Sequence, residues 1–137
     1  MNCPHCKNPM LVLELEQVET DYCINCKGIW LDSGELELLL EDPSDKNELL
    51  NLFTETKGTK EKRIKCPICF TKMDKVFVSK DKEIIIDECK NGHGLWFDKG
   101  EILDVIKVGS VNKENKIVKI LEDMYKHKIN TKQTEEI

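Results

Sequence analysis

Residues of the types that bind metal ions occur in two sets with the same order. The first set is Cys3, Cys6, Cys23 and Cys26, and the second is Cys66, Cys69, Cys89 and His93. Each set opens with Cys-Pro-x-Cys and is completed, after an insert of hairpin length, by a second ligand pair. Four soft ligands arranged in this way converge on one tetrahedral ion, which is the pattern of structural zinc. The sequence therefore predicts two Zn²⁺ ions per chain.

Other uses of the cysteines are weaker. Four thiolates also suit iron, so a rubredoxin-like centre stays open for the first set. Redox chemistry at Cys-x-x-Cys would need a thioredoxin-like βαβ setting, which is absent from the pattern. Seven cysteines are an odd number for disulfides, and because Met1-Asn2 leads straight into the first pair we expect no signal peptide. We expect metal-bound thiolates in the reducing cytoplasm.

The second set is less regular than the first. Gly92 stands where Cys26 stands in the first set, and His93 follows one residue later. An imidazole reaches farther than a thiol, and glycines on both sides relax the chain, so we predict His93 as the fourth ligand. The alternative is three cysteines with water or a carboxylate such as Asp87. His5 and His127 are expected on the surface.

A β-hairpin is predicted between the two ligand pairs of each set. The strand-forming segments are 10–15 and 18–22 in the first copy, and 73–79 and 83–87 in the second. A helix is predicted after each hairpin, with Asp32 or Asp98 as N-cap and Glu35 or Glu101 completing a capping box. Further helices are predicted around 49–53, after Pro43, and over 110–130, where apolar residues share one face.

These elements predict a small α+β protein stabilised by metal. It consists of two zinc ribbons (knuckle, β-hairpin, knuckle), each followed by a short helix, with a longer helix at the C-terminus. The expected divisions are 1–56 (first ribbon and helices), 57–65 (linker), 66–109 (second ribbon and helix), 110–130 (amphipathic helix) and 131–137 (frayed tail). Units this small bury little apolar surface, so bound metal must supply much of their stability.

Charge is distributed unevenly along the chain, whose net charge is -5. Residues 1–56 hold 3 Lys against 12 Asp or Glu, whereas residues 57–82 hold 9 Lys or Arg against 3 acids. Phosphate binding needs clustered positive charge, so the basic segment 57–82 is the only candidate nucleic-acid surface. No apolar run is long enough to cross a membrane, and we expect no membrane contact.

The residues quoted above, together with Trp30-Leu31-Asp32-x-Gly34-Glu35-Leu36, resemble the transcription factor IIB-like zinc ribbon family (zf-TFIIB). The second copy, ending in Trp96-Phe97-Asp98-x-Gly100-Glu101, is similar to another member in tandem. The resemblance covers about 3–41 and 66–107 and implies a metal-binding role for the ligand residues. It implies a link to transcription only through the zinc fold.

Trp30 and Trp96 follow the second knuckle of each copy. They either pack over the metal thiolates or form an aromatic surface for a partner. Closed metal sites, and the lack of a Ser-His-Asp set or phosphate loop, predict no enzyme activity. The sequence favours a non-catalytic protein-interaction or adaptor module with a protein partner, and its amphipathic helices could also form a homodimer. The alternative is nucleic-acid binding through 57–82.

Overall fold

The computed structural model describes residues 1–40, 49, 51, 53–55, 62–78, 84–109 and 116–135, with only the backbone described at 54, 55, 109 and 126–135. Within these residues, antiparallel strands form one seven-stranded sheet in the order β1-β2-β3-β7-β6-β5-β4. The strands are β1 (Leu11–Leu15), β2 (Val18–Tyr22), β3 (Ile29–Asp32), β4 (Thr54–Glu55), β5 (Asp74–Phe77), β6 (Ile85–Glu88) and β7 (Gly94–Phe97). The helices are α1 (Glu35–Leu39), α3 (Glu101–Gly109) and α4 (Lys116–Glu135). The predicted α+β class is confirmed.

Two hairpins place the ligand pairs. We call residues 1–40 ribbon one and residues 62–109 ribbon two. The β1–β2 hairpin matches its predicted strands closely, and its turn contains Glu16 and Gln17, whose φ angles are 46° and 70°. In ribbon two, β5 pairs with β6, while the turn that joins them lies outside the described residues. Each hairpin also has a third strand that the sequence analysis missed, β3 in ribbon one and β7 in ribbon two.

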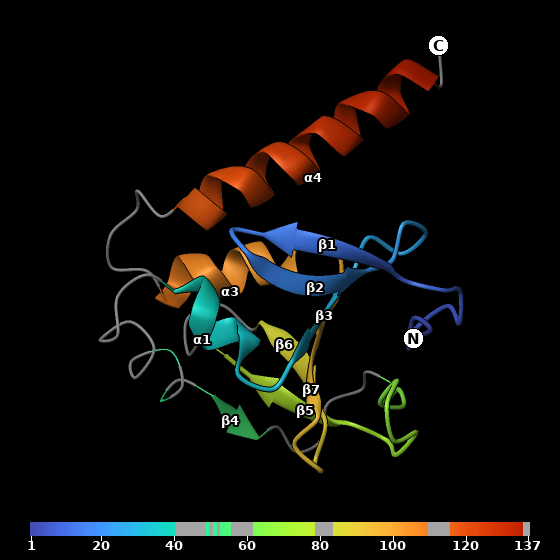
Figure 1. Ribbon diagram of the computed structural model, residues 1–137, viewed down its shortest axis with the longest axis vertical. Helices are drawn as coiled ribbons and strands as arrows, with labels where there is room; N and C mark the ends of the chain where they lie inside the picture. The colour runs from blue at the N-terminus through green and yellow to red at the C-terminus, as the bar shows by residue number, and fades with distance from the viewer. Residues whose placement is uncertain are drawn as a thin grey trace.

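The two missed strands join the ribbons. β3 pairs with β7 in antiparallel register, so that Trp30 lies opposite Trp96 and Ile29 lies opposite Phe97. Equivalent sequence motifs from the two ribbons therefore pair with each other across this seam. The two ribbons are related by an approximate two-fold axis there. β1 and β4 form the opposite edges of the sheet (Figure 1).

The sheet has a core on each face because successive side chains of a strand point to opposite sides. Ile29, Leu31 and Phe97 belong to a large core that includes the helices. Trp30 and Trp96 belong to a second core, which they share with the metal-ligating cysteines and with Met73. The seam strands thus carry the helix-packed core on one face and the metal centres on the other.

Tryptophan and glycine interlock across the seam. A Cβ atom on Gly28 would lie 2.3 Å from Cζ2 of Trp96, and one on Gly94 would lie 2.7 Å from Cζ2 of Trp30. Gly28 and Gly94 each precede the tryptophan of their own ribbon by two residues. Each indole therefore occupies the space that a side chain would need in the other ribbon, and neither glycine can be replaced without moving a ring.

The helices bury most of their described apolar residues within this chain, although Leu38 and Ile120 are exposed. The fully or nearly fully buried positions are Leu36, Leu39, Ile102, Val105, Ile106, Ile117, Val118, Leu121 and Tyr125. Tyr125 of α4 also donates a hydrogen bond from its hydroxyl to the carbonyl of Lys27 at 3.1 Å, which ties α4 to the second knuckle of ribbon one. Figure 1 shows α4 beside β1 and β2. These faces have partners inside the chain, and the predicted homodimer stays a prediction.

The helix starts differ from the predicted capping. Gly34, with φ 89°, is the N-cap of α1 and makes no side-chain cap hydrogen bond. The predicted contacts of the two glutamates are present. The carboxylate of Glu35 accepts a hydrogen bond from the backbone N–H of Asp32 at 2.6 Å, and the carboxylate of Glu101 accepts one from the backbone N–H of Asp98 at 2.9 Å. The prediction of Asp32 as an N-cap was wrong, and its carboxylate accepts a hydrogen bond from the Trp30 indole instead. The carboxylate of Asp98 accepts one from the Trp96 indole, and its role as N-cap of α3 stays a prediction.

Other segments depart from the expected pattern. Thr54 and Glu55 form the edge strand β4 and extend the sheet beyond β5. The predicted helix around 49–53 falls largely outside the described residues, although Leu49 is helical and fully buried. α4 continues through Glu135, into the segment predicted to fray. None of the described helices is long and apolar enough to span a bilayer.

We predict that Gly28→Ala destabilises the zinc-loaded protein by about 1–3 kcal/mol, because the new methyl group must displace the Trp96 ring. Urea unfolding followed by tryptophan fluorescence measures this change. Gly100→Ala is the control, since its Cβ would meet nothing within 4 Å and would add only the strain of its positive φ, about 1 kcal/mol. A Gly28→Ala protein no less stable than the control would contradict the interlock.

Candidate metal centres

Site one gathers the four cysteines of ribbon one. Cys3 and Cys6 lie on the loop before β1, and Cys23 and Cys26 lie on the loop between β2 and β3. Their sulfur atoms all lie within 4.8 Å of one another, and Sγ of Cys6 is 3.5 Å from Sγ of Cys23. The β1–β2 hairpin, whose open end carries both loops, therefore brings the predicted ligands together.

Site two gathers Cys66, Cys69, Cys89 and His93 in the same way. Their ligand atoms also lie within 4.8 Å of one another. Sγ of Cys89 is 3.7 Å from Sγ of Cys69 and 3.4 Å from Nδ1 of His93. Asp87, the alternative ligand, belongs to neither cluster and instead forms a buried ion pair with Lys75 at 2.7 Å. The structure thus favours the imidazole over the carboxylate as the fourth ligand.

The spacing of both sets fits zinc. Tetrahedral zinc with bonds of about 2.3 Å to sulfur separates its sulfur ligands by about 3.8 Å. The observed separations of 3.5 and 3.7 Å are close to this value and far from the roughly 2.05 Å of a disulfide. Each site also has four protein ligands, which leaves no coordination position open for water. A closed ligand set of this kind is typical of structural zinc. The residues present fit two zinc ions.

Tight turns form the knuckles. In three of them the residue after the second cysteine, Lys7, Lys27 or Phe70, has a positive φ, and its N–H donates to the carbonyl of the first cysteine at 2.8–2.9 Å. In the fourth, Gly92 has the positive φ, and its N–H donates to the carbonyl of Cys89 at 3.0 Å. This turn closes one residue earlier, which leaves the next residue, His93, to supply the ligand.

Hydrogen bonds to sulfur stabilise thiolates in both sites. Backbone N–H groups donate to sulfur at 3.2–3.4 Å, namely those of His5 and Cys6 to Cys3, of Cys26 to Cys23, of Ile68 to Cys66, and of Asn91 to Cys89. Two asparagine side chains add to them. Nδ2 of Asn8 lies 3.3 Å from Sγ of Cys6, and Nδ2 of Asn91 lies 3.4 Å from Sγ of Cys69. Such outer contacts orient ligands and tune the bound metal.

The cysteines differ in how readily they ionise. A hydrogen bond from the backbone of Asn8 is the main cause that lowers the pKa of Cys6 to about 6. The side-chain amide of Asn91 is the main cause that lowers the pKa of Cys69 to about 5. Burial raises the pKa of Cys3 and that of Cys66 to about 11. Each site thus pairs an accessible thiolate with a buried thiol that must lose its proton to bind metal.

The two tryptophans have a structural role here. Both side chains are 0% exposed, and each indole N–H donates to the aspartate two residues later, at 2.9 Å, Trp30 to Asp32 and Trp96 to Asp98. They pack with the ligating cysteines in one core. The suggested partner-binding surface at Trp30 and Trp96 is therefore corrected, because a fully buried ring cannot contact a partner.

Sequence reasoning missed several residues around the sites. His5 is exposed as expected, but its Nδ1 lies 3.5 Å from Sγ of Cys26. Asn8 and Asn91 lie two residues after Cys6 and Cys89. Their position close to a ligand in the sequence could have identified them, because the side-chain amide of an asparagine next to a knuckle can donate a hydrogen bond to sulfur. The side chain of His127 lies outside the described residues.

The fold and the two closed ligand sets define a tandem zinc-ribbon protein. Residues 2–42 match the family model Zn_ribbon_TFIIB, described as "Transcription factor zinc-finger". The match spans site one, β1, β2, β3 and α1, so the similarity to this family covers ribbon one. Ribbon two lies outside the matched residues, and its assignment as a second zinc ribbon depends on the repeated ligands and on site two. The comparisons with curated proteins and with solved structures gave no match.

We predict that His93→Ala removes one zinc from the purified chain and leaves the other bound. Native mass spectrometry should show two zinc ions in the wild type and one in the variant. His5→Ala is the matched control, because His5 contacts Cys26 but lies outside the four-ligand set, and it should retain both ions. A His93→Ala protein that keeps two tightly held zinc ions would contradict the assignment of site two.

We also predict that acid releases the zinc. Cys3 and Cys66, whose pKa values are about 11 without metal, are protonated at neutral pH and must release protons when metal binds. The stability that zinc supplies is therefore present at neutral and alkaline pH and is lost as pH falls. Affinity should fall about tenfold per pH unit for each proton released. A chromogenic chelator records release from about pH 8 to about pH 4, and release independent of pH would contradict this account.

Proposed function

We propose that this chain is a non-catalytic adaptor that uses two zinc-organised ribbons to present a rigid surface to a protein partner. The observation that carries the proposal is that both metal sets are complete. Site one has four cysteines and site two has three cysteines and a histidine, so zinc bound there has structural rather than hydrolytic chemistry. Bound metal then serves to hold the sheet and the loops around it in place.

Exposed apolar side chains support a protein partner. Val12 on the edge strand β1 is 67% exposed, Leu38 on α1 is 65% exposed, and Phe70 on the first knuckle of ribbon two is 70% exposed. Aromatic and apolar side chains are favoured at the centres of protein interfaces. Phe70 also has a positive φ of 61°, a conformation that bulky residues rarely adopt, and the knuckle holds it facing solvent.

We place this adaptor in the cytoplasm, where a reducing environment keeps thiols available for metal. The seven cysteines are free of disulfides. Nucleic-acid binding through 57–82 is less favoured, because two of its described cations are already paired. Arg63 forms an ion pair with Asp74 at 2.9 Å, and Lys75 forms a buried ion pair with Asp87.

Affinity capture with nuclease treatment tests the proposal. Zinc-loaded protein immobilised through a terminal tag is exposed to lysate, and retained proteins are identified before and after nuclease digestion. We expect specific proteins to remain bound after nuclease digestion. Their retention should be lost when the Phe70→Ser variant is immobilised in place of the wild type. Lys119→Ser, an exposed substitution on α4, is the control and should retain them. Retention that disappears with nuclease would instead support the nucleic-acid alternative.

A further inference from the structure

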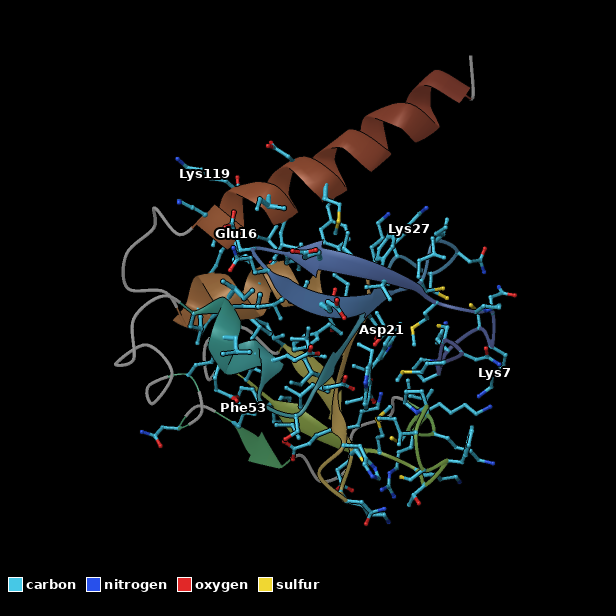
Figure 2. The ribbon with its side chains drawn as sticks, viewed as in Figure 1. Lys7, Glu16, Asp21, Lys27, Phe53 and Lys119 are labelled. Carbon is cyan, nitrogen blue, oxygen red and sulfur yellow. The ribbon has the colours of Figure 1, made fainter. Side chains whose placement is uncertain are left out.

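A basic hollow lies between the two ribbons. Its volume is about 530 Å³, and the basic residues that line it are Lys7, Lys62, Arg63, Lys65, Lys72 and Lys75. We call it the inter-ribbon groove. The first knuckle of ribbon one, where Lys7 is labelled in Figure 2, supplies one wall. Ribbon two supplies the other, mainly through residues 62–65 and 72, which precede β5. This volume is in the range of sites that bind small ligands.

Four lysines in the groove are available to a ligand. Lys75 is buried and paired with Asp87. Arg63 is held by Asp74 and by the carbonyl of Met73, to which its Nε donates at 2.9 Å. The others, Lys7, Lys62, Lys65 and Lys72, are exposed. The ammonium group of Lys7 donates to the carbonyl of Pro4 at 3.3 Å, a contact that leaves its charge unbalanced. Among the residues that the structure describes, no carboxylate lies within ion-pair distance of these four.

Two of these lysines face each other across a β-bridge. Lys65 pairs with Lys72 in an isolated antiparallel bridge, and like charges directly opposite one another destabilise such a pair. The equivalent bridge in ribbon one joins Asn2 and Pro9, which are uncharged. Ribbon one therefore forms the same bridge with uncharged residues, so the fold does not require lysines there. In ribbon two the two lysines repel each other, and a bound anion would relieve that repulsion.

The wall formed by ribbon one also differs between the repeats, but here the charged residue is in ribbon one. Lys7 follows the second cysteine of the first knuckle in ribbon one, and the equivalent residue in ribbon two is Phe70. Both have a positive φ and close the same turn. The turn therefore does not require a lysine. The positive charge of the groove is a property of this chain and not a requirement of the zinc-ribbon fold.

We propose that the inter-ribbon groove binds an acidic, Asp- or Glu-rich segment of a protein partner. This inference depends on the adaptor function proposed above and names the chemistry of the partner. A short acidic segment can place its carboxylates on the four lysines without extending past them. A nucleic-acid strand would continue onto a protein whose net charge is -5 and whose ribbon one is strongly acidic, where phosphates are repelled.

Binding of a fluorescein-labelled hexaglutamate peptide to the zinc-loaded full chain tests this proposal by fluorescence polarisation. We expect saturable binding that weakens as salt rises. Lys65→Gln combined with Lys72→Gln should weaken binding about tenfold or more, since two charge pairs are lost. Lys7→Gln combined with Lys62→Gln should weaken binding by a similar factor, because these two lysines line another part of the groove. Native mass spectrometry should show two zinc ions in each variant.

Lys116→Gln combined with Lys119→Gln is the matched control, because it removes the same charge from exposed positions on α4. Its affinity should stay within about twofold of the wild type, since the contacts in the groove are unchanged. Equal loss in all three double variants, or no binding by the wild type, would overturn the proposal. Tighter binding of a 12-nucleotide single-stranded DNA through Lys65 and Lys72 would also overturn it. Nuclease-resistant capture of a partner without hexaglutamate binding would refute the groove and leave the adaptor function standing.

Discussion

The reciprocal packing of Trp30 and Trp96 across the β3–β7 seam is the interaction on which the rest of the structure depends. Each indole fills the space left by a glycine in the other ribbon and packs against the cysteines of the metal centres. The seam therefore connects site one to site two through one continuous core. Two small ribbons that would each bury too little apolar surface become a single sheet with a core on both faces.

Metal and seam depend on each other. Structural zinc can supply on the order of 10 kcal/mol of apparent folding free energy in small domains, but only when the knuckles are held in place. The second knuckle of each ribbon lies between a hairpin strand and a seam strand, β2 and β3 in ribbon one and β6 and β7 in ribbon two. Tyr125 extends this arrangement to α4 through its hydrogen bond to the carbonyl of Lys27. Loops that would be mobile alone, including those of the inter-ribbon groove, are thereby fixed relative to one another.

The ligands and hairpins could be predicted because their signals are local. Cys-Pro-x-Cys spacing and the runs at 10–15 and 18–22 each specify their structure within a few residues. The seam could not be predicted in this way, since β3 and β7 are strands of four residues whose partner lies more than 60 positions away. Asp32 was misassigned for a related reason. Its sequence context fits a cap, but the buried indole N–H of Trp30 offered the stronger partner.

The central claim is that each metal site supports the opposite ribbon through the seam. Hydrogen exchange on wild type and on Cys66→Ser, which removes one ligand of site two, tests it most directly. The account predicts that amides of β2 and β3 in ribbon one lose protection in the variant, although all four ligands of site one are intact. Unchanged protection in β2 and β3, with loss confined to ribbon two, would show that the ribbons are independent and would contradict the account.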